Sequence, residues 1–217
     1  FSLHPGFLKI LFSFGMPPNK IISYYTHSRF SVYKYLKYLE KVKYVLALNY
    51  FERNLLRMEG DFNNIKIFPV GYDPQIFKLN NNNNDRFFDV VISCKYNDKD
   101  SYYYLRKNYE FLILLISNLI ADKKKILILG RNWKECKSLK ESAYLTIKDL
   151  DHHKYANEYN NSKIFLNLSL YEGGPVSWLE ALACGCINIS TANGFATSLI
   201  LEKLDSYLMD NNFQVSD

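Results

Sequence analysis

The sequence predicts an α/β fold with two units, each a parallel sheet flanked by helices. Short apolar runs alternate with helical segments along the chain, and a polar run at Asn80–Asp85 interrupts the pattern once. The 217 residues, of which 48% are hydrophobic, are enough for two modest domains with apolar cores. We therefore expect an N-terminal unit at 1–79, a linker at 80–85 and a C-terminal unit at 86–217.

The first unit follows the order helix, strand, helix, strand, helix, strand. Its expected elements are a helix at about Pro5–Gly15, a strand at Lys20–Tyr25, a helix at about Val32–Glu40, a strand at Tyr44–Leu48, a helix at Tyr50–Glu59 and a strand at Ile65–Phe68. Strands joined through helices pair in parallel, because the helix returns the chain to the same end of the sheet. This order predicts a Rossmann-like unit.

The second unit repeats the alternation. Its expected strands are Phe88–Cys94, Lys124–Gly130, Tyr144–Ile147, Lys163–Ser169, Cys186–Ser190 and Ser206–Met209. Its expected helices are Asn108–Ile120, residues 151–162, a helix that begins around Gly174–Pro175 and another that begins at Ala196. We therefore expect a second Rossmann-like unit.

Composition excludes several classes of protein. The most apolar segment, Phe111–Ala121, is shorter than the roughly 18 residues that span a bilayer. The first residues lack a signal-peptide cleavage site, and the four cysteines form no C-x-x-C pair, which is typical of reduced thiols. We therefore expect a cytoplasmic protein, either free or peripheral at the inner face of a membrane. The chain begins without methionine, so we expect it to be a piece of a longer protein.

The excess positive charge lies in the first third of the chain. Residues 1–77 hold 10 Lys or Arg against 5 Asp or Glu, whereas residues 78–217 hold 17 of each. A basic lobe favours an anionic partner, either membrane headgroups or a phosphorylated acceptor, and dispersed surface lysines explain it equally well. The tyrosines are spread over expected strands and helices, so no nucleic-acid partner is expected.

The stretch SLYEGGPVSWLEALACGC, at Ser169–Cys186, indicates a ligand site. Glu172, Gly173 and Gly174 follow an expected strand directly, at the edge where open α/β sheets bind ligands. Pro175 suits the first helical position, where its missing N–H has no cost. The free amides of such a helix start favour a phosphate group, and the glycines let it approach the backbone.

Glu180 falls in the second turn of the same expected helix. Its neighbours three and four positions away are uncharged, so no ion pair forms along the helix. Two interpretations stay open at this point. Glu180 is either the exposed acid of an amphipathic helix or the acceptor for paired hydroxyls, such as those of a ribose.

This stretch resembles the E-x7-E signature of retaining glycosyltransferases with the GT-B fold, the glycosyl transferases group 1 type. The matching residues are Glu172, Gly173, Leu179, Glu180, Ala181, Ala183, Gly185 and Ile189. Three further segments resemble the family: Tyr24–Arg29, Pro69–Phe77 and residues 155–169. The resemblance implies a GT-B-like α/β fold with an acceptor-side N-terminal domain, here incomplete, and a nucleotide-sugar domain that lacks its last helices.

The resemblance also implies roles for individual residues. Glu172 would contact the donor sugar and Glu180 the ribose, and Lys107 would bind the diphosphate and stabilise its departing charge. Lys95 is a second diphosphate cation, with Arg106 as its competitor, and His27 would contact the sugar or the acceptor. The remaining expected contacts are backbone amides at Gly173, Gly174, Val176 and Ser177 for the sugar and diphosphate, Thr146 and Ile147 for the base, and Gly130 and Arg131 at the border of the pocket.

The implied reaction transfers a sugar from a nucleotide-sugar donor, such as a UDP- or GDP-sugar, to a hydroxyl of a glycan, lipid-linked or other acceptor. It retains anomeric configuration and uses no metal ion and no cofactor; the acids of Asn97–Asp100 are expected to be solvated. Two alternatives stay open. The first alternative is a non-catalytic nucleotide-sugar-binding module. The second is a sugar-nucleotide epimerase on the same fold.

Overall fold

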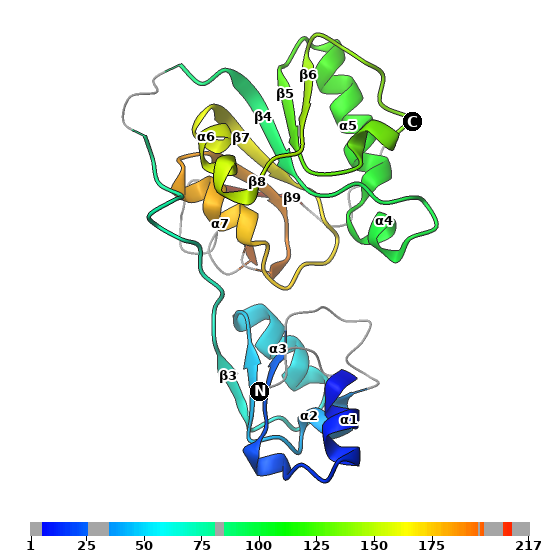
Figure 1. Ribbon diagram of the computed structural model, residues 1–217, viewed down its shortest axis with the longest axis vertical. Helices are drawn as coiled ribbons and strands as arrows, with labels where there is room; N and C mark the ends of the chain where they lie inside the picture. Colours follow the sequence, from blue (N-terminus) through cyan, green and yellow to red (C-terminus); the bar gives the residue numbers. More distant parts are fainter. Residues whose placement is uncertain (1–5, 26–34, 81–84, 195, 198–205, 210–217) are drawn as a thin grey trace. The chain divides into compact units, whose positions relative to one another are not determined.

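The computed structural model describes residues 6–25, 35–80, 85–194, 196–197 and 206–209 (Figure 1). The chain forms two compact units. Unit 1 comprises Phe1–Val70, Tyr171–Pro175 and Asn193–Glu202, and unit 2 comprises Gly71–Leu170, Val176–Ala192 and Lys203–Asp217. Short pieces of the second half of the chain thus belong to the first unit.

Unit 1 contains a parallel sheet in the order β1-β2-β3. Its strands are β1 (Ile22–Tyr25), β2 (Tyr44–Ala47) and β3 (Ile65–Ile67), and its helices are α1 (Gly6–Ser13), the 3-10 turn η1 (Pro18–Lys20), α2 (Leu36–Leu39) and α3 (Tyr50–Glu59). The helices contribute Leu8, Leu39 and Leu56 to a core that also contains Val45 and Ile65 from the strands. The three strands alternate with helices, as the sequence predicts.

Local signals fix the helix ends in unit 1. The Asn49 side chain caps α3 by accepting a hydrogen bond from the Glu52 amide at 2.9 Å, which satisfies one of the free N–H groups of the first turn. After α1, Gly15 adopts a left-handed φ of +72° and the Met16 amide donates to the Leu11 carbonyl at 3.0 Å. This arrangement is a common helix stop that favours glycine.

Unit 2 contains a parallel sheet in the order β6-β5-β4-β7-β8-β9. Its strands are β4 (Phe88–Ser93), β5 (Ile126–Leu129), β6 (Leu145–Lys148), β7 (Ser162–Asn167), β8 (Ile187–Thr191) and β9 (Ser206–Met209). Counted along the chain, this is the order 3-2-1-4-5-6 of the Rossmann fold, in which the strand order reverses beside the first strand. The reversal lies between β4 and β7.

The helices of unit 2 cover both faces of its sheet. They are α4 (Tyr102–Arg106), α5 (Tyr109–Ala121), α6 (Tyr155–Asn160) and α7 (Val176–Ala183), with 3-10 turns η2 (Trp133–Glu135) and η3 (His152–Lys154). In Figure 1, α5 packs beside β5 on one face, and α6 and α7 pack together on the other. Right-handed crossovers that start on both sides of β4 produce this arrangement.

Several boundaries differ from the sequence prediction. Helix α4 was not predicted, because three consecutive tyrosines are weak helix formers and their N-cap, Ser101, stands in a polar segment. The helix expected at 151–162 starts instead with η3, and α7 begins at Val176, just after Pro175. Most of the helix expected from Ala196 lies outside the described residues, as do positions 32–34 of the helix expected at Val32–Glu40.

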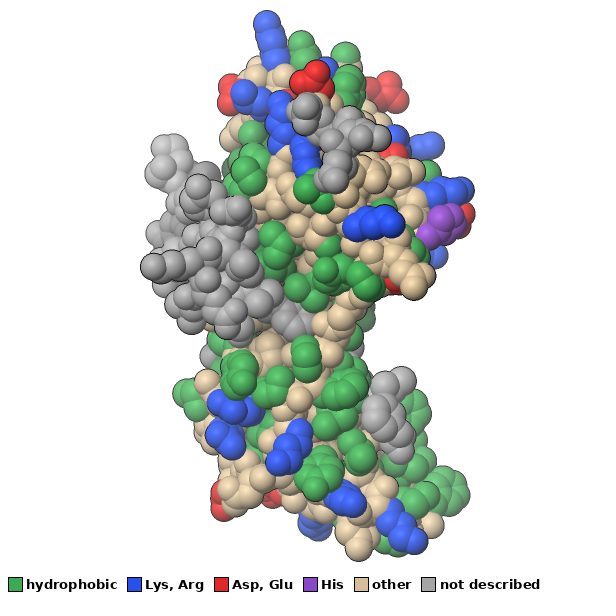
Figure 2. Space-filling view, turned by 90° about the vertical axis from the view of Figure 1, so that its left-hand side faces the viewer, with side chains coloured by type: hydrophobic (Ala, Val, Ile, Leu, Met, Phe, Trp, Pro, Cys, Tyr) green, Lys and Arg blue, Asp and Glu red, His purple; other side chains and the backbone are tan. Residues whose placement is uncertain are grey.

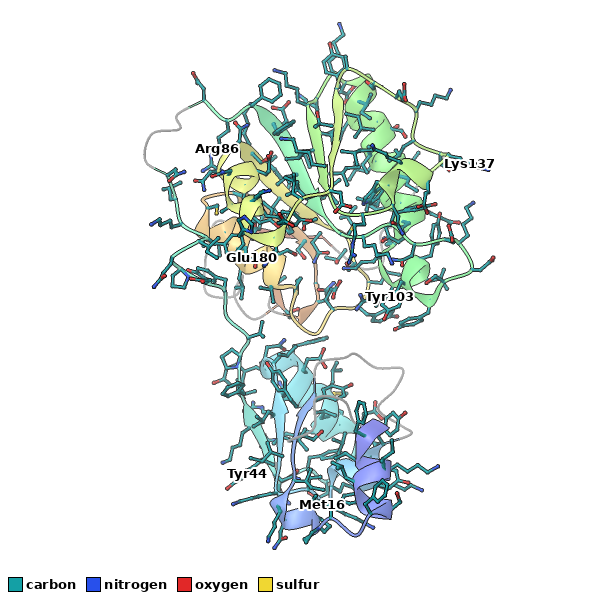
Figure 3. The ribbon with its side chains drawn as sticks, in the orientation of Figure 1. Met16, Tyr44, Arg86, Tyr103, Lys137 and Glu180 are labelled. Atoms are coloured by element: carbon teal, nitrogen blue, oxygen red, sulfur yellow. The ribbon has the colours of Figure 1, made fainter. Side chains whose placement is uncertain are left out.

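Basic side chains of unit 1 are dispersed rather than gathered. Figure 2 shows Lys and Arg scattered among hydrophobic side chains on the face of unit 1 that it draws. Lys43 and Lys66 both lie over the ring of Tyr44, at 5.8 and 5.9 Å from its centroid, and Figure 3 labels this tyrosine. On this face the distribution is that of solvated surface charges.

Candidate functional site

A pocket lies at the carboxyl ends of β4, β5 and β6 in unit 2. Its volume is about 680 Å³, and it is lined by residues 93–95, 129–131, 149–152, 154 and 155. Ligand pockets commonly have this size. In an open parallel sheet this edge, next to the reversal of strand order, is where ligands bind.

Contacts to the backbone fix the ends of β4 and β5. Gly130 has a φ of +148°, and a Cβ at this position would lie 2.1 Å from the Cys94 carbonyl oxygen, so only glycine fits. The indole N–H of Trp133 donates to the same oxygen at 2.7 Å. The phenol of Tyr109 donates to the Lys95 carbonyl oxygen. These contacts determine where the Lys95 side chain leaves the backbone.

The charges of the pocket favour an anionic ligand. Lys95, Arg131 and Lys154 line it together with Asp149 and Asp151. Lys154 pairs with Asp151 at 3.2 Å. In the described part of the chain neither Lys95 nor Arg131 forms an ion pair. Two exposed cations are therefore available to an anionic ligand, and the guanidinium offers it paired donors.

Beside this pocket, Glu180 on α7 forms an ion pair with His152. The imidazole Nε2 lies 2.8 Å from Glu180 Oε1, and the two side chains are 66% and 2% exposed, respectively. The second carboxylate oxygen, Oε2, is buried and has no hydrogen-bond partner among the described residues. Burial raises the pKa of Glu180, and the hydrogen bond from His152 lowers it in part. A nearly enclosed carboxylate with one unpaired acceptor therefore lies behind a pocket residue.

The loop Tyr171–Pro175, which carries Glu172, belongs to unit 1. The Asn49 side chain donates to the Gly173 carbonyl oxygen at 2.5 Å. Gly194, with a φ of +50°, approaches so closely that a Cβ would lie 2.9 Å from the Glu172 carbonyl oxygen. Glu172 itself is buried. Asn49 thus caps α3 with its oxygen and holds the glycine turn with its nitrogen.

Helix α7 starts immediately after this loop, at Val176. Its first amides belong to Val176 and Ser177, since Pro175 has no N–H. The helix follows β7, so it begins at the carboxyl edge of the unit 2 sheet. The amides of a helix start are ready donors to a phosphate.

Residues 102–217 match the model of a protein family described as glycosyl transferases group 1, which is more than half of the chain. The chain belongs to this family. Among curated proteins, no sequence matches it.

Solved structures with the GT-B fold resemble this group 1 glycosyltransferase chain. Sucrose-phosphate synthase from Thermosynechococcus elongatus has a TM-score of 0.68 at 17% identity, over 88% of this chain and 55% of that one. A TarM mutant from S. aureus, in complex with fondaparinux, α-GlcNAc-glycerol and UDP, has a TM-score of 0.75 at 16% identity, over 96% of this chain and 44% of that one. HepE from Anabaena, in complex with UDP and glucose, has a TM-score of 0.69 at 12% identity, over 95% of this chain and 62% of that one.

The predicted fold class is confirmed: α/β, GT-B-like, with parallel Rossmann-like sheets in two units. The chain spans roughly half the length of these solved proteins, from 44% to 62%. At identities of 17% and below, the likeness concerns the fold.

The pocket brings some of the expected site residues together. Lys95, Gly130 and Arg131 line it. In the described structure Arg106 and Lys107 are not among its lining residues. The Arg106 guanidinium lies 5.1 Å from the centroid of the Tyr103 ring, and Lys107 ends α4 with its amide donating to the Tyr103 carbonyl oxygen at 3.0 Å.

The other expected residues have different places. Thr146 and Ile147 lie within β6, and Ile147 packs against the apolar core. The described residues that line the pocket after β6 are instead Asp149, Leu150 and Asp151. His27 lies outside the described residues.

No role was assigned to His152 from the sequence. The side chain is exposed, and yet it contacts the Glu180 carboxylate. Its position soon after an expected strand was the available signal, because strand ends of a parallel sheet share one edge. The contact itself joins residues 28 positions apart, which no local pattern reveals.

Metal-ligand groups and membrane-spanning helices are both absent from the part of the chain that the structure describes. No group of three or more His, Cys, Asp or Glu side chains in them is arranged to hold a metal ion. None of the helices in the described residues is long and apolar enough to cross a membrane.

Proposed function

We propose that this chain provides the nucleotide-sugar site of a glycosyltransferase that transfers a sugar to an acceptor hydroxyl with retention of configuration. The observation that carries the proposal is the pocket at the carboxyl ends of β4–β6. It is lined by two cations that form no ion pair in the described structure and by His152, which pairs with Glu180 beside the pocket. Family membership and the strand order of unit 2 support it. A nucleoside diphosphate offers the matching groups, which are an anionic diphosphate and a ribose diol.

In this proposal, residues of unit 2 bind the diphosphate, the ribose and the base of the donor. Lys95 and Arg131 bind the diphosphate, and the first amides of α7 at Val176 and Ser177 add donors. Glu180 accepts a hydrogen bond from the ribose. Glu172 contacts the sugar, as the E-x7-E resemblance implies. The base lies against residues 149–151 rather than against Thr146 and Ile147.

The reaction then needs charge stabilisation more than a protein nucleophile. As the bond to the sugar breaks, negative charge grows on the departing diphosphate, and fixed cations and amides stabilise it without rearranging. The departing phosphate accepts the proton of the attacking hydroxyl on the same face of the sugar. We assign no metal ion and no cofactor to this step.

Uridine is the first base to test, because HepE has been solved with UDP and glucose and TarM with UDP. The experiment is a thermal-shift series with UDP, GDP and ADP and their glucose and N-acetylglucosamine derivatives. A ligand at 100 times its Kd stabilises the folded state by about 2.7 kcal/mol. We expect one nucleotide to raise the melting temperature most. If none of them raises it, the donor site is refuted.

Matched variants test whether the rise in melting temperature depends on residues of the pocket. We expect Lys95→Ala and Arg131→Ala to reduce the shift given by the nucleoside diphosphate. Lys137→Ala is the control, since this exposed lysine of unit 2 is not among the lining residues and is labelled apart from Glu180 in Figure 3. Equal shifts in all three variants would contradict the assignment.

Turnover separates the enzyme from the non-catalytic alternative. We expect release of the nucleoside diphosphate from its sugar in the presence of simple glycan acceptors, and its loss in Glu172→Ala and Arg131→Ala. Nucleotide binding without turnover would favour a binding module, and conversion of the nucleotide sugar without an acceptor would favour an epimerase.

A further inference from the structure

His152 and Glu180 form a pair in which one member faces the pocket. Among the described residues, His152 lines the pocket and Glu180 does not. The His152 side chain is also the exposed one of the two. A ligand in the pocket therefore meets the imidazole, and any group that binds Glu180 shares the carboxylate with His152.

The two oxygens of Glu180 have different surroundings. Oε1 accepts a hydrogen bond from His152 Nε2 at 2.8 Å. Oε2 is enclosed and has no partner in the described structure. An enclosed acceptor without a donor costs free energy, and a hydroxyl that donates to it removes that cost. The carboxylate is thus satisfied on one side and lacks a donor on the other.

Three further ionisable groups act electrostatically on Glu180. They are Tyr155 and Tyr159 on α6 and Cys184, which directly follows α7. Burial raises the pKa of both tyrosines, and it raises the pKa of Cys184 to about 11. All three are therefore neutral near pH 7 and bring no positive charge to the carboxylate. Among the described groups that act on Glu180, His152 is the one that favours its ionised form.

We propose that His152 is a positioning residue of the nucleotide site that acts through Glu180. It holds Oε1, favours the ionised carboxylate over the neutral acid and leaves Oε2 for a ribose hydroxyl. This inference rests on the proposed function, because it takes the ribose of a nucleotide as the ligand. The imidazole is itself held by aromatic rings, with centroids 5.3 Å away for Phe77 and 5.7 Å away for Tyr155. A carboxylate that is oriented in advance loses less entropy when the ligand binds.

The test measures the affinities for UDP, GDP and ADP by calorimetry between about pH 5 and about pH 8. For the nucleotide that binds best, we expect His152→Ala to weaken binding about tenfold at neutral pH, as for a lost hydrogen bond to a charged group. We also expect binding to be lost at a higher pH than in the wild type as the solution is acidified. Removing the donor raises the pKa of Glu180 further, so the carboxylate becomes protonated earlier.

Two variants control for structural damage. His152→Gln carries an amide nitrogen near the position of Nε2, so it restores most of the affinity. His153→Ala, at the exposed neighbouring histidine, behaves as the wild type. A purely structural defect would weaken binding equally at every pH and would not be rescued by glutamine. If circular dichroism shows that His152→Ala does not fold, the affinities of His152→Gln and the wild type are compared across the pH range instead.

A double-mutant cycle shows whether His152 acts through Glu180. With Glu180→Gln already present, we expect His152→Ala to change the affinity little, because the interaction it removes is gone. Equal losses with and without Glu180→Gln would overturn the inference, and so would an unchanged pH profile. If the wild type binds no nucleotide, the proposed function fails and the inference with it. If the wild type binds and the His152 variants bind equally well, the inference alone fails.

Discussion

Two opposing effects act on the pKa of Glu180, which lies almost fully enclosed in unit 2. Burial raises the pKa and is the larger effect, and the hydrogen bond from His152 lowers it. Ionising this carboxyl group therefore costs more in the folded chain than in the unfolded chain. The residue that we assign to the ribose thus lowers the stability of unit 2 at neutral pH.

We predict that Glu180→Gln raises the free energy of unfolding at about pH 8, and that this gain shrinks toward about pH 5. The folded-state pKa of Glu180 is raised, so the protonated carboxyl group contributes fully to the free energy of unfolding below the unfolded-state pKa. This contribution is lost as the pH rises through the folded-state pKa. Neutral glutamine has no such loss.

Urea unfolding followed by tryptophan fluorescence measures this, since both tryptophans, Trp133 and Trp178, are buried in unit 2. A variant less stable than the wild type by the same amount at each pH would contradict the prediction. A variant that gains stability and binds nucleotides more weakly would connect the burial of Glu180 to function.

At the scale of single residues, the sequence indicated candidate ligand groups but not their protein partners. The E-x7-E spacing pointed to Glu172 and Glu180, and the glycine turn to a phosphate that approaches the backbone, and both stay predictions. The partners His152 and Asn49 were missed. Both contacts join segments far apart in the chain, so they depend on how the elements pack and not on spacing.

At the scale of elements, a close backbone approach in unit 2 joins the ends of β4 and β5. Gly130 lies against the Cys94 carbonyl group with a positive φ, and this contact shapes the floor of the pocket. Any side chain at this position would push the two strand ends apart. The glycine therefore allows the ends of β4 and β5 to pair and keeps Lys95 in its position.

We predict that Gly130→Ala lowers the free energy of unfolding by at least about 1–3 kcal/mol, the usual cost of a strained backbone position. The same change also weakens nucleoside diphosphate binding, because Cys94 and Lys95 must shift. Urea unfolding and thermal shift with UDP measure the two effects. Gly71→Ala is the control, since a Cβ there meets no atom within 4 Å and φ is not in the left-handed range. We expect that control to change stability by less than about 1 kcal/mol. An alanine variant at 130 as stable as this control would refute the prediction.

Elements with strong apolar runs were the predictable ones. The four residues of β5 are all buried, so periodicity and composition both identify the strand. Helix α4 was not found, because it is short and is stabilised by its contacts rather than by propensity. Tyr104 of α4, for example, packs into the core cluster with Tyr109.

For the whole molecule, the segment that follows unit 1 belongs to unit 2 from Gly71 onward. Phe77 is buried, and the Asn160 side chain donates to the Lys78 carbonyl oxygen at 2.9 Å and accepts from the Asn80 amide at 2.8 Å. The residues that lead into the asparagine run are thus attached to unit 2. The sequence predicted a linker at 80–85 from composition, which indicates polarity and does not indicate which unit the flanking residues contact.

Arg86 is the anchor on the far side of that run, and Figure 3 labels it. Its guanidinium donates to the Ser162 carbonyl oxygen at 2.6 Å and to the Cys184 carbonyl oxygen at 3.0 Å. Gly185 lies beneath it, where a Cβ would be 2.7 Å from Nη2. One side chain thereby joins the start of β7 to the turn after α7.

We predict that Arg86→Ala lowers the free energy of unfolding of unit 2 by about 2–3 kcal/mol, because it removes two hydrogen bonds from a charged donor. Arg86→Lys should lose most of this stability as well, since an ammonium group cannot reproduce the planar pair of donors. Tryptophan fluorescence during urea unfolding measures the change in unit 2. Arg57→Ala, at an exposed position of α3 in unit 1, is the control and should leave that transition in place. If Arg86→Ala and Arg57→Ala gave the same midpoint, the segment after the asparagine run would not be held to unit 2 by Arg86.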